Sequence, residues 1–136
     1  MKINEPPYDY VREDERRLVY VRAHRTLTAA DVAALLYRQI HDAAWAYGVL
    51  YDLRMTDAPT STDDAVKIAG LVSELVTTYG PRGPVALVTK DDAMRAAPEI
   101  HARHAGPAIN MQVFLNFTEA KQWLTGQWRA SSRGVQ

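Results

Sequence analysis

Residue types that could carry out chemistry gather in one stretch, VLYDLRMTDAPTSTDD, which covers residues 49–64. An apolar run ends there in Asp52, and three hydroxyl residues, Thr60, Ser61 and Thr62, follow. A carboxylate at a strand end can bind Mg²⁺ together with a phosphoryl group. Hydroxyls in front of a helix can accept a phosphate or cap the helix. The stretch therefore has three interpretations: a phosphorylated aspartate, a phosphorylated hydroxyl, or a strand that leads into a helix.

The first interpretation treats Asp52 as the phosphoacceptor of a degenerate receiver-like domain. VLYDLRM echoes the aspartate strand of response-regulator receivers, and PVALVT would supply Thr89 as their switch threonine. Such a site needs further acids on a neighbouring strand to hold Mg²⁺, but that strand ends with Arg22, His24 and Arg25. The alternative is a partly buried Asp52 that Arg22 or His24 neutralises from the adjacent strand. We favour this structural role.

The second half of the stretch has the composition of a helix N-terminus. Ser61 followed by Asp64 gives the capping-box pattern, and acids in a first turn suit the positive end of a helix. A phosphate on a hydroxyl here would be favoured by the dipole but repelled by Asp63 and Asp64. The same residue can cap the helix and accept a phosphate. The candidate phosphoacceptor or partner loop comprises Asp57, Thr60, Ser61 and Thr62.

Other catalytic and metal-binding chemistry has less support in the sequence. The chain has no cysteine, which excludes disulfides and thiolate chemistry. His101 and His104 stand near Glu99 at a spacing that suits a shared metal, but the sequence places no third ligand. Neither a nucleophile elbow nor a glycine-rich phosphate loop occurs. We therefore predict a protein that is not an enzyme and has no cofactor or metal.

Aromatic residues provide a further hypothesis, a carrier or sensor of a small apolar or lipid ligand. Seven tyrosines and three tryptophans are available, although such residues more often fill cores and interfaces. A ligand held between sheet and helices would lie among Tyr20, Trp45, Tyr51 and Trp123.

Composition limits the classes of protein and partner. The chain has 136 residues, 47% of them hydrophobic and 24% charged, as in an ordinary globular domain. Sixteen basic residues balance sixteen acidic ones, so no net charge attracts nucleic acid or an anionic membrane. No apolar run approaches the roughly 20 residues of a membrane span, and the N-terminus lacks a signal-peptide core. We expect a cytoplasmic protein, and its neutral charge favours a homodimer.

Periodicity in the sequence predicts alternating strands and helices. Residues 8–23 form two strands around the acidic turn 13–15. They are followed by a helix from Thr28 towards Gly48, a strand at 49–53, a helix at 61–79, a strand at 84–89, a helix at 91–104, a strand at 111–115 and a helix at 118–126. This order predicts a single layered α/β domain, residues 8–126, in which an antiparallel hairpin precedes parallel strands. Residues 1–7 form a flexible lead and 127–136 a frayed tail.

Four segments resemble the STAS superfamily of anti-sigma-factor antagonists, and within it the SpoIIAA-like group. RLVYVRAHRTLTAADVAALL resembles the second strand and first helix of that group, VLYDLR its central strand, and PVALVT the next strand. VFLNFTEAKQWL resembles the closing strand and helix, with Ala120, Trp123 and Leu124 in the ending. The resemblance extends over residues 8–126, and its specificity lies in the order and spacing of the segments.

The resemblance implies a small regulatory α/β domain that binds protein partners through loop 54–63. In the antagonists, a partner kinase phosphorylates a serine in an Asp-Ser-Ser-Gly-like segment before the second helix. The corresponding segment here is DAPTST, residues 57–62, which lacks the glycine, and Ser61 is the nearest positional match. The group is also similar in outline to lipid-transfer folds, which implies an apolar ligand as the alternative.

Overall fold

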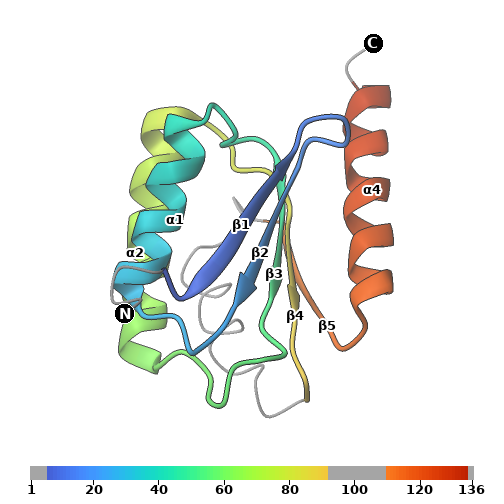
Figure 1. The fold of residues 1–136 in the computed structure, drawn as a ribbon. Helices are drawn as coiled ribbons and strands as arrows, with labels where there is room; N and C mark the ends of the chain where they lie inside the picture. The colour runs from blue at the N-terminus through green and yellow to red at the C-terminus, as the bar shows by residue number, and fades with distance from the viewer. Residues whose placement is uncertain (1–5, 92–109, 135–136) are drawn as a thin grey trace.

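A five-stranded sheet forms the centre of the molecule (Figure 1). The structure is a computed structural model that describes residues 6–91 and 110–134, with side chains described as far as residue 127. The strands are β1 (Tyr8–Glu13), β2 (Leu18–Ala23), β3 (Gly48–Asp52), β4 (Val85–Val88) and β5 (Met111–Phe114), in the order β1-β2-β3-β4-β5. β1 is antiparallel to β2, and all other neighbours are parallel. The predicted α/β architecture with its opening hairpin is confirmed.

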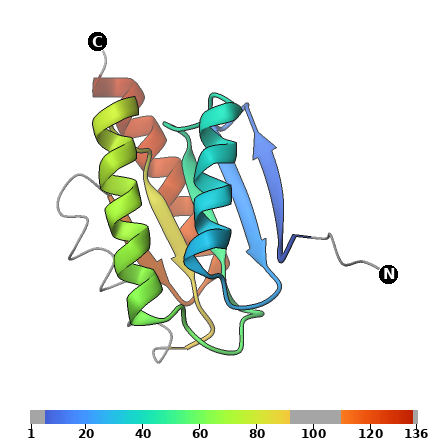
Figure 2. The ribbon, with the colours of Figure 1, turned by 90° about the vertical axis from the view of Figure 1, so that its left-hand side faces the viewer.

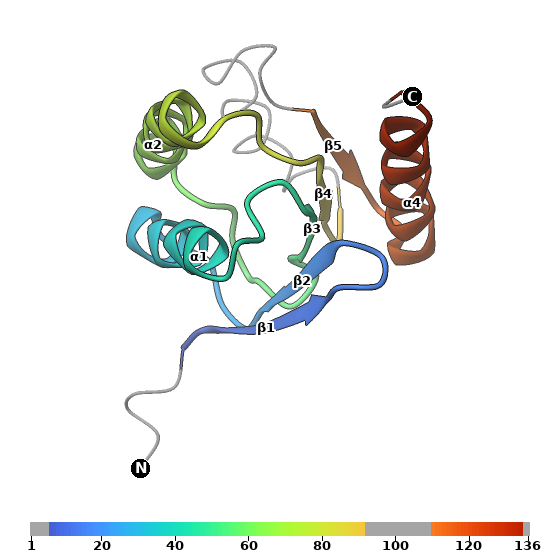
Figure 3. The same cartoon turned by 90° about the horizontal axis from the view of Figure 1, so that it is seen from above.

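Helices cover both faces of this sheet, so the fold has three layers. α1 (Ala29–His41) and α2 (Thr62–Tyr79) lie side by side on one face (Figure 2). Of the described helices, α4 (Phe117–Gly134) is the one that lies on the other face (Figure 3). β3 is buried along its whole length, as expected for a central parallel strand covered on both faces. Alternate residues of β2 and β3 supply the cores on the two faces, with Val19 and Val49 in the core on the α1–α2 side and Leu18 and Leu50 in the core on the α4 side.

The helix starts follow the capping patterns in the sequence. The Thr28 side chain accepts a hydrogen bond from the Asp31 backbone, and the Asp31 carboxylate accepts one from the Thr28 backbone, which completes a capping box before α1. Ser61 caps α2 by accepting a hydrogen bond from the Asp64 backbone N–H. α2 ends at Gly80, whose φ of 90° favours glycine.

Two predicted helix ends are wrong. α1 stops at His41 instead of continuing towards Gly48, because Ala43 adopts a left-handed φ of 58°. The buried Gln39 side chain then donates to the Ala44 carbonyl and stabilises the turn. α4 continues through Gly126 to Gly134, since an interior glycine costs a helix only about 1 kcal/mol relative to alanine. The tail predicted to fray is therefore helical as far as Gly134. The helix predicted at 91–104 falls almost entirely outside the described residues.

Candidate functional site

The loop after β3 lies at the carboxyl end of the parallel strands, where α/β sheets commonly bind ligands (Figure 1). Hydrogen bonds to neighbouring segments fix its position. Thr26 Oγ1 donates to the Ala58 carbonyl at 2.6 Å, and Thr60 Oγ1 donates to the Leu27 carbonyl at 2.9 Å. Within the loop, Thr56 Oγ1 donates to the Leu53 carbonyl at 2.8 Å. The loop is therefore attached to the segment between β2 and α1.

The predicted phosphoacceptor residues differ in their accessibility. Asp57, Ser61 and Thr62 are exposed, whereas Thr60 is half-buried and its hydroxyl is used to hold the loop. Ser61 Oγ lies 3.1 Å from the Asp64 backbone nitrogen, so the predicted helix cap is present. Ser61 thus combines a capping role with an accessible hydroxyl.

Asp52 is almost completely buried at 4% exposure and is bound by two arginines. Arg22 is its register partner on β2, and their side chains approach to 3.7 Å as the alternation predicts. The closer partner is Arg54, which donates from Nη2 to Oδ2 at 2.8 Å and from Nε to Oδ1 at 2.9 Å. His24 instead lies 3.1 Å from Asp9 of β1. Burial raises the pKa of Asp52, but the hydrogen bonds and charge of Arg54 bring it below its ordinary value.

The surroundings of Asp52 differ from those of a receiver. Receivers use the strand order 2-1-3-4-5, whereas this sheet follows the sequence order. Thr89 is buried, and its hydroxyl donates to the Asp91 carbonyl at 3.2 Å. Within residues 6–91 and 110–127, no three acidic or histidine side chains gather to hold a metal. In the described residues, the surroundings of Asp52 therefore differ from a receiver's phosphorylation site in strand order and in nearby acids.

A pocket of about 100 Å³ lies between the sheet, α1 and α2, beneath the strand-end loop. Its walls are mainly apolar and include Leu36, Val72 and Leu87. The loop residues Ala58 and Pro59 also line the pocket and are exposed, and the pocket is partly open to solvent.

The four aromatic residues predicted to surround a ligand lie in different places. Tyr51 lines the pocket, whereas Trp45 packs in the cluster between α1 and α2. Tyr20 and Trp123 belong to the core on the α4 side of the sheet. Tyr20 points to the opposite side of the sheet from its neighbours Val19 and Val21, and Trp123 lies on α4, so the sheet separates both residues from the pocket.

Arg82, in the turn between α2 and β4, is the pocket residue that the sequence analysis missed. Its side chain lines the pocket and is only 8% exposed. Nη2 lies 3.4 Å from the Tyr51 hydroxyl, and the guanidinium lies 5.0 Å from the centre of the Trp45 ring. The only sequence signal is a charged residue in the stiff segment GPRGP, which gives no indication of burial.

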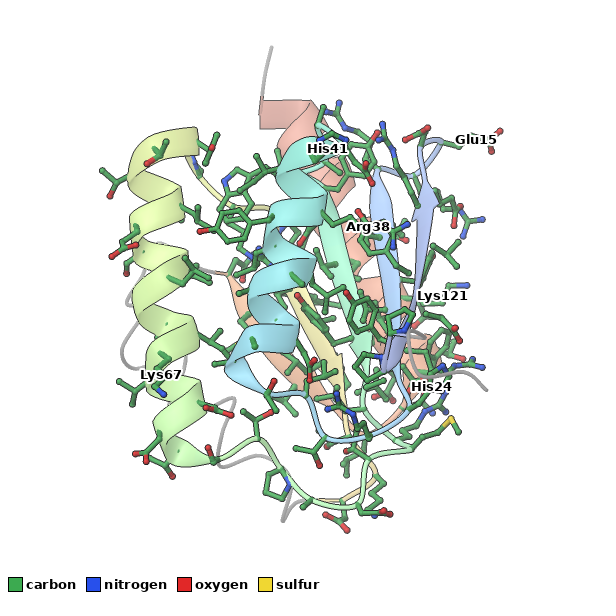
Figure 4. The ribbon with its side chains drawn as sticks, turned by 60° about the vertical axis from the view of Figure 1, so that its left-hand side comes forward. Glu15, His24, Arg38, His41, Lys67 and Lys121 are labelled. Carbon is green, nitrogen blue, oxygen red and sulfur yellow. The ribbon has the colours of Figure 1, made fainter. Side chains whose placement is uncertain are left out.

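The histidines provide no shared site in the described part of the chain. His24 follows β2 at the carboxyl end of the sheet, whereas His41 closes α1 at the opposite end (Figure 4). His101, His104 and Glu99, considered above as metal ligands, lie outside the described residues.

Comparison with known proteins shows the fold. No protein-family model matches the sequence, and no curated protein matches it. Among solved structures, the chain is similar to an uncharacterized DUF3478-family protein with a SpoIIAA-like fold from Shewanella loihica PV-4. The two are 19% identical, and the match covers 86% of this chain and 91% of the other at a TM-score of 0.55. The chain therefore has a SpoIIAA-like fold, as its sequence resemblance predicts. In the described residues, no helix is long and apolar enough to cross a membrane.

Proposed function

We propose that this chain is a non-catalytic regulatory module that binds a protein partner through loop 54–63. The observation that supports this most is the way the loop is held. Thr26 and Thr60 fix it from the inner side, while Met55, Asp57 and Ser61 stay exposed on the outer side. A preorganised surface loses less conformational entropy on binding than a mobile one.

The exposed side chains suit a partner with an apolar contact and a basic rim. Met55 is 58% exposed, and methionine adapts well to varied binding surfaces. Leu115, which is also exposed, follows β5 at the same edge of the sheet. Asp57 and Asp63 add exposed negative charge to the loop, which would favour a positively charged partner surface.

Phosphorylation of Ser61 by a partner kinase is the regulatory input that we propose for this loop. The hydroxyl is exposed at the first turn of α2, where a helix dipole favours a phosphate. Asp63 and Asp64 would oppose that charge, so a phosphate would rearrange the loop surface and change how it fits the partner.

A pull-down from native extract tests the module. The wild-type chain is compared with the double variant Met55→Glu/Asp57→Lys and with Glu15→Lys. Glu15 is exposed in the β1–β2 turn, at the opposite end of the molecule from the loop (Figure 4). We expect a stable partner that the loop variant loses and the Glu15 variant retains. Absence of any partner, or equal retention by both variants, would overturn the proposal.

A carrier or sensor of a small apolar ligand is the second candidate, and the pocket beneath the loop favours it. Native mass spectrometry of the chain purified from its own cells tests this function. We expect a fraction with added ligand mass, and the bare chain mass alone would count against it. Cytoplasmic location and homodimer formation remain predictions from the sequence.

A further inference from the structure

We propose that the pocket beneath loop 54–63 binds a small organic carboxylate, with its apolar body in the pocket and its anionic head on Arg82. This inference rests on the second candidate function and deepens it, because it names the chemistry of the ligand head group. The pocket joins mainly apolar walls to one buried cationic side chain.

The guanidinium of Arg82 has donors that the described residues leave unused. A guanidinium carries five N–H donors, but here Nη2 has one long contact, 3.4 Å, to Tyr51. Nη1 is buried and meets no acceptor within the described ranges 6–91 and 110–127. No carboxylate of those ranges forms an ion pair with Arg82. Because buried charges are normally paired, an anionic ligand would supply the partner that the Arg82 guanidinium lacks among these residues.

The surroundings of Arg82 hold the guanidinium in place for such a ligand. The centre of the Trp45 ring lies 5.0 Å from the guanidinium, and the guanidinium Nη2 contacts the Tyr51 hydroxyl. Gly83 fixes the backbone, because a side chain there would overlap the carbonyl oxygens of Ala46 and Tyr47. A planar guanidinium held in this way can form two parallel hydrogen bonds with a carboxylate.

Charge and size limit the ligand class. One arginine balances the single charge of a carboxylate, whereas a phosphate dianion would leave charge unpaired in an apolar site. The pocket of about 100 Å³ is smaller than the roughly 150 Å³ cavity that is known to bind benzene. Because the pocket is partly open to solvent, an apolar body of about benzene's size can lie in it with part of its surface outside. Benzoate and isovalerate represent this class.

Isothermal titration and amide NMR with benzoate test the inference, with benzyl alcohol as the neutral probe. The wild-type chain should bind benzoate at least about tenfold more tightly than benzyl alcohol, because only the benzoate carboxylate forms an ion pair with Arg82. Arg82→Met should weaken benzoate binding at least about tenfold and leave benzyl alcohol nearly unchanged. Arg16→Met, which removes an exposed arginine from the β1–β2 turn, should change neither affinity.

The outcomes separate the inference from the function on which it rests. Equal affinity for both probes, or benzoate binding that Arg82→Met does not weaken, would show that Arg82 does not bind an anionic head group. The second candidate function, an apolar ligand in the pocket, would be unaffected. Absence of binding by either probe would overturn the inference as a whole, and a native ligand of another size would still be seen by native mass spectrometry. If Arg82→Met fails to fold, the test is the ratio of the wild-type affinities for benzoate and benzyl alcohol.

Discussion

Asp52 and Arg54 form a two-point ion pair at the end of β3, with Nη2–Oδ2 and Nε–Oδ1 distances of 2.8 and 2.9 Å. The arginine side chain also covers the Phe117 ring at the start of α4, at 5.2 Å from the ring centre. The carboxylate therefore links the central strand to the helix on the opposite face from the pocket. In the structure, Asp52 therefore helps to join β3 to α4 through Arg54.

Replacing Asp52 by asparagine should destabilise the fold in a pH-dependent way. Hydrogen bonds from Arg54 outweigh the effect of burial and lower the pKa of Asp52 below its ordinary value of 3.8. A lowered pKa stabilises the folded state above about pH 4, and this contribution is lost as the pH falls through the folded-state pKa. Urea denaturation should show a loss of about 1–3 kcal/mol at pH 7 and a smaller loss at pH 3. Equal losses at both pH values would show that the ion pair contributes little; Asp63→Asn is the exposed control.

Asp52 should also resist phosphorylation. Its two oxygens already accept hydrogen bonds from Arg54, and its side chain is buried. Intact-protein mass spectrometry after incubation with acetyl phosphate and Mg²⁺ should show no phosphoryl adduct. An adduct that Asp52→Asn removes would restore the receiver interpretation.

Ser61→Ala should lower the free energy of unfolding by about 1 kcal/mol, because the start of α2 loses its cap. Ser61→Asp should retain most of the stability, since aspartate is also a good cap. Ser73→Ala, at an exposed position inside α2, is the matched control and should change stability by less than about 0.5 kcal/mol. If the two alanine variants have the same effect, the cap is not stabilising.

Gly83→Ala should lower the free energy of unfolding by about 2 kcal/mol or more. The new Cβ would overlap two backbone carbonyl oxygens, which cannot move aside as the end of a flexible side chain can. Gly70→Ala is the contrasting change, since no atom of a neighbouring element lies within 4 Å of the new Cβ in α2. Its higher helix propensity should add about 0.5–1 kcal/mol to the stability. Thermal denaturation of the two variants checks both signs, and a neutral Gly83→Ala would contradict the close packing beside Arg82.

The elements of the fold were predictable because their periodicity and caps are local. Ser61 with Asp64 gave the start of α2, and alternation placed Arg22 beside Asp52. The extent of α4 was not predictable, because Gly126 is a weak stop whose small cost neighbouring residues can offset. Local patterns decide where elements form, while their ends depend on small energies.

The site was predictable only in its location. Alternation could not place Arg54, because it follows the strand and its direction depends on the loop. Arg82 stands in a turn, where the prior expectation is exposure, and it becomes buried only when the turn packs against Trp45 and Tyr51. Burial that depends on packing between distant segments leaves no pattern in the sequence.

Site-specific photocrosslinking tests the central claim that loop 54–63 is the partner surface. A photoreactive amino acid replaces Met55 in one sample and Glu15 in another, and both are irradiated in native extract. Both positions are exposed, but only Met55 belongs to the loop. The account predicts a discrete protein adduct at Met55 that is absent at Glu15. Adducts of equal yield at both positions, or none at Met55, would contradict it.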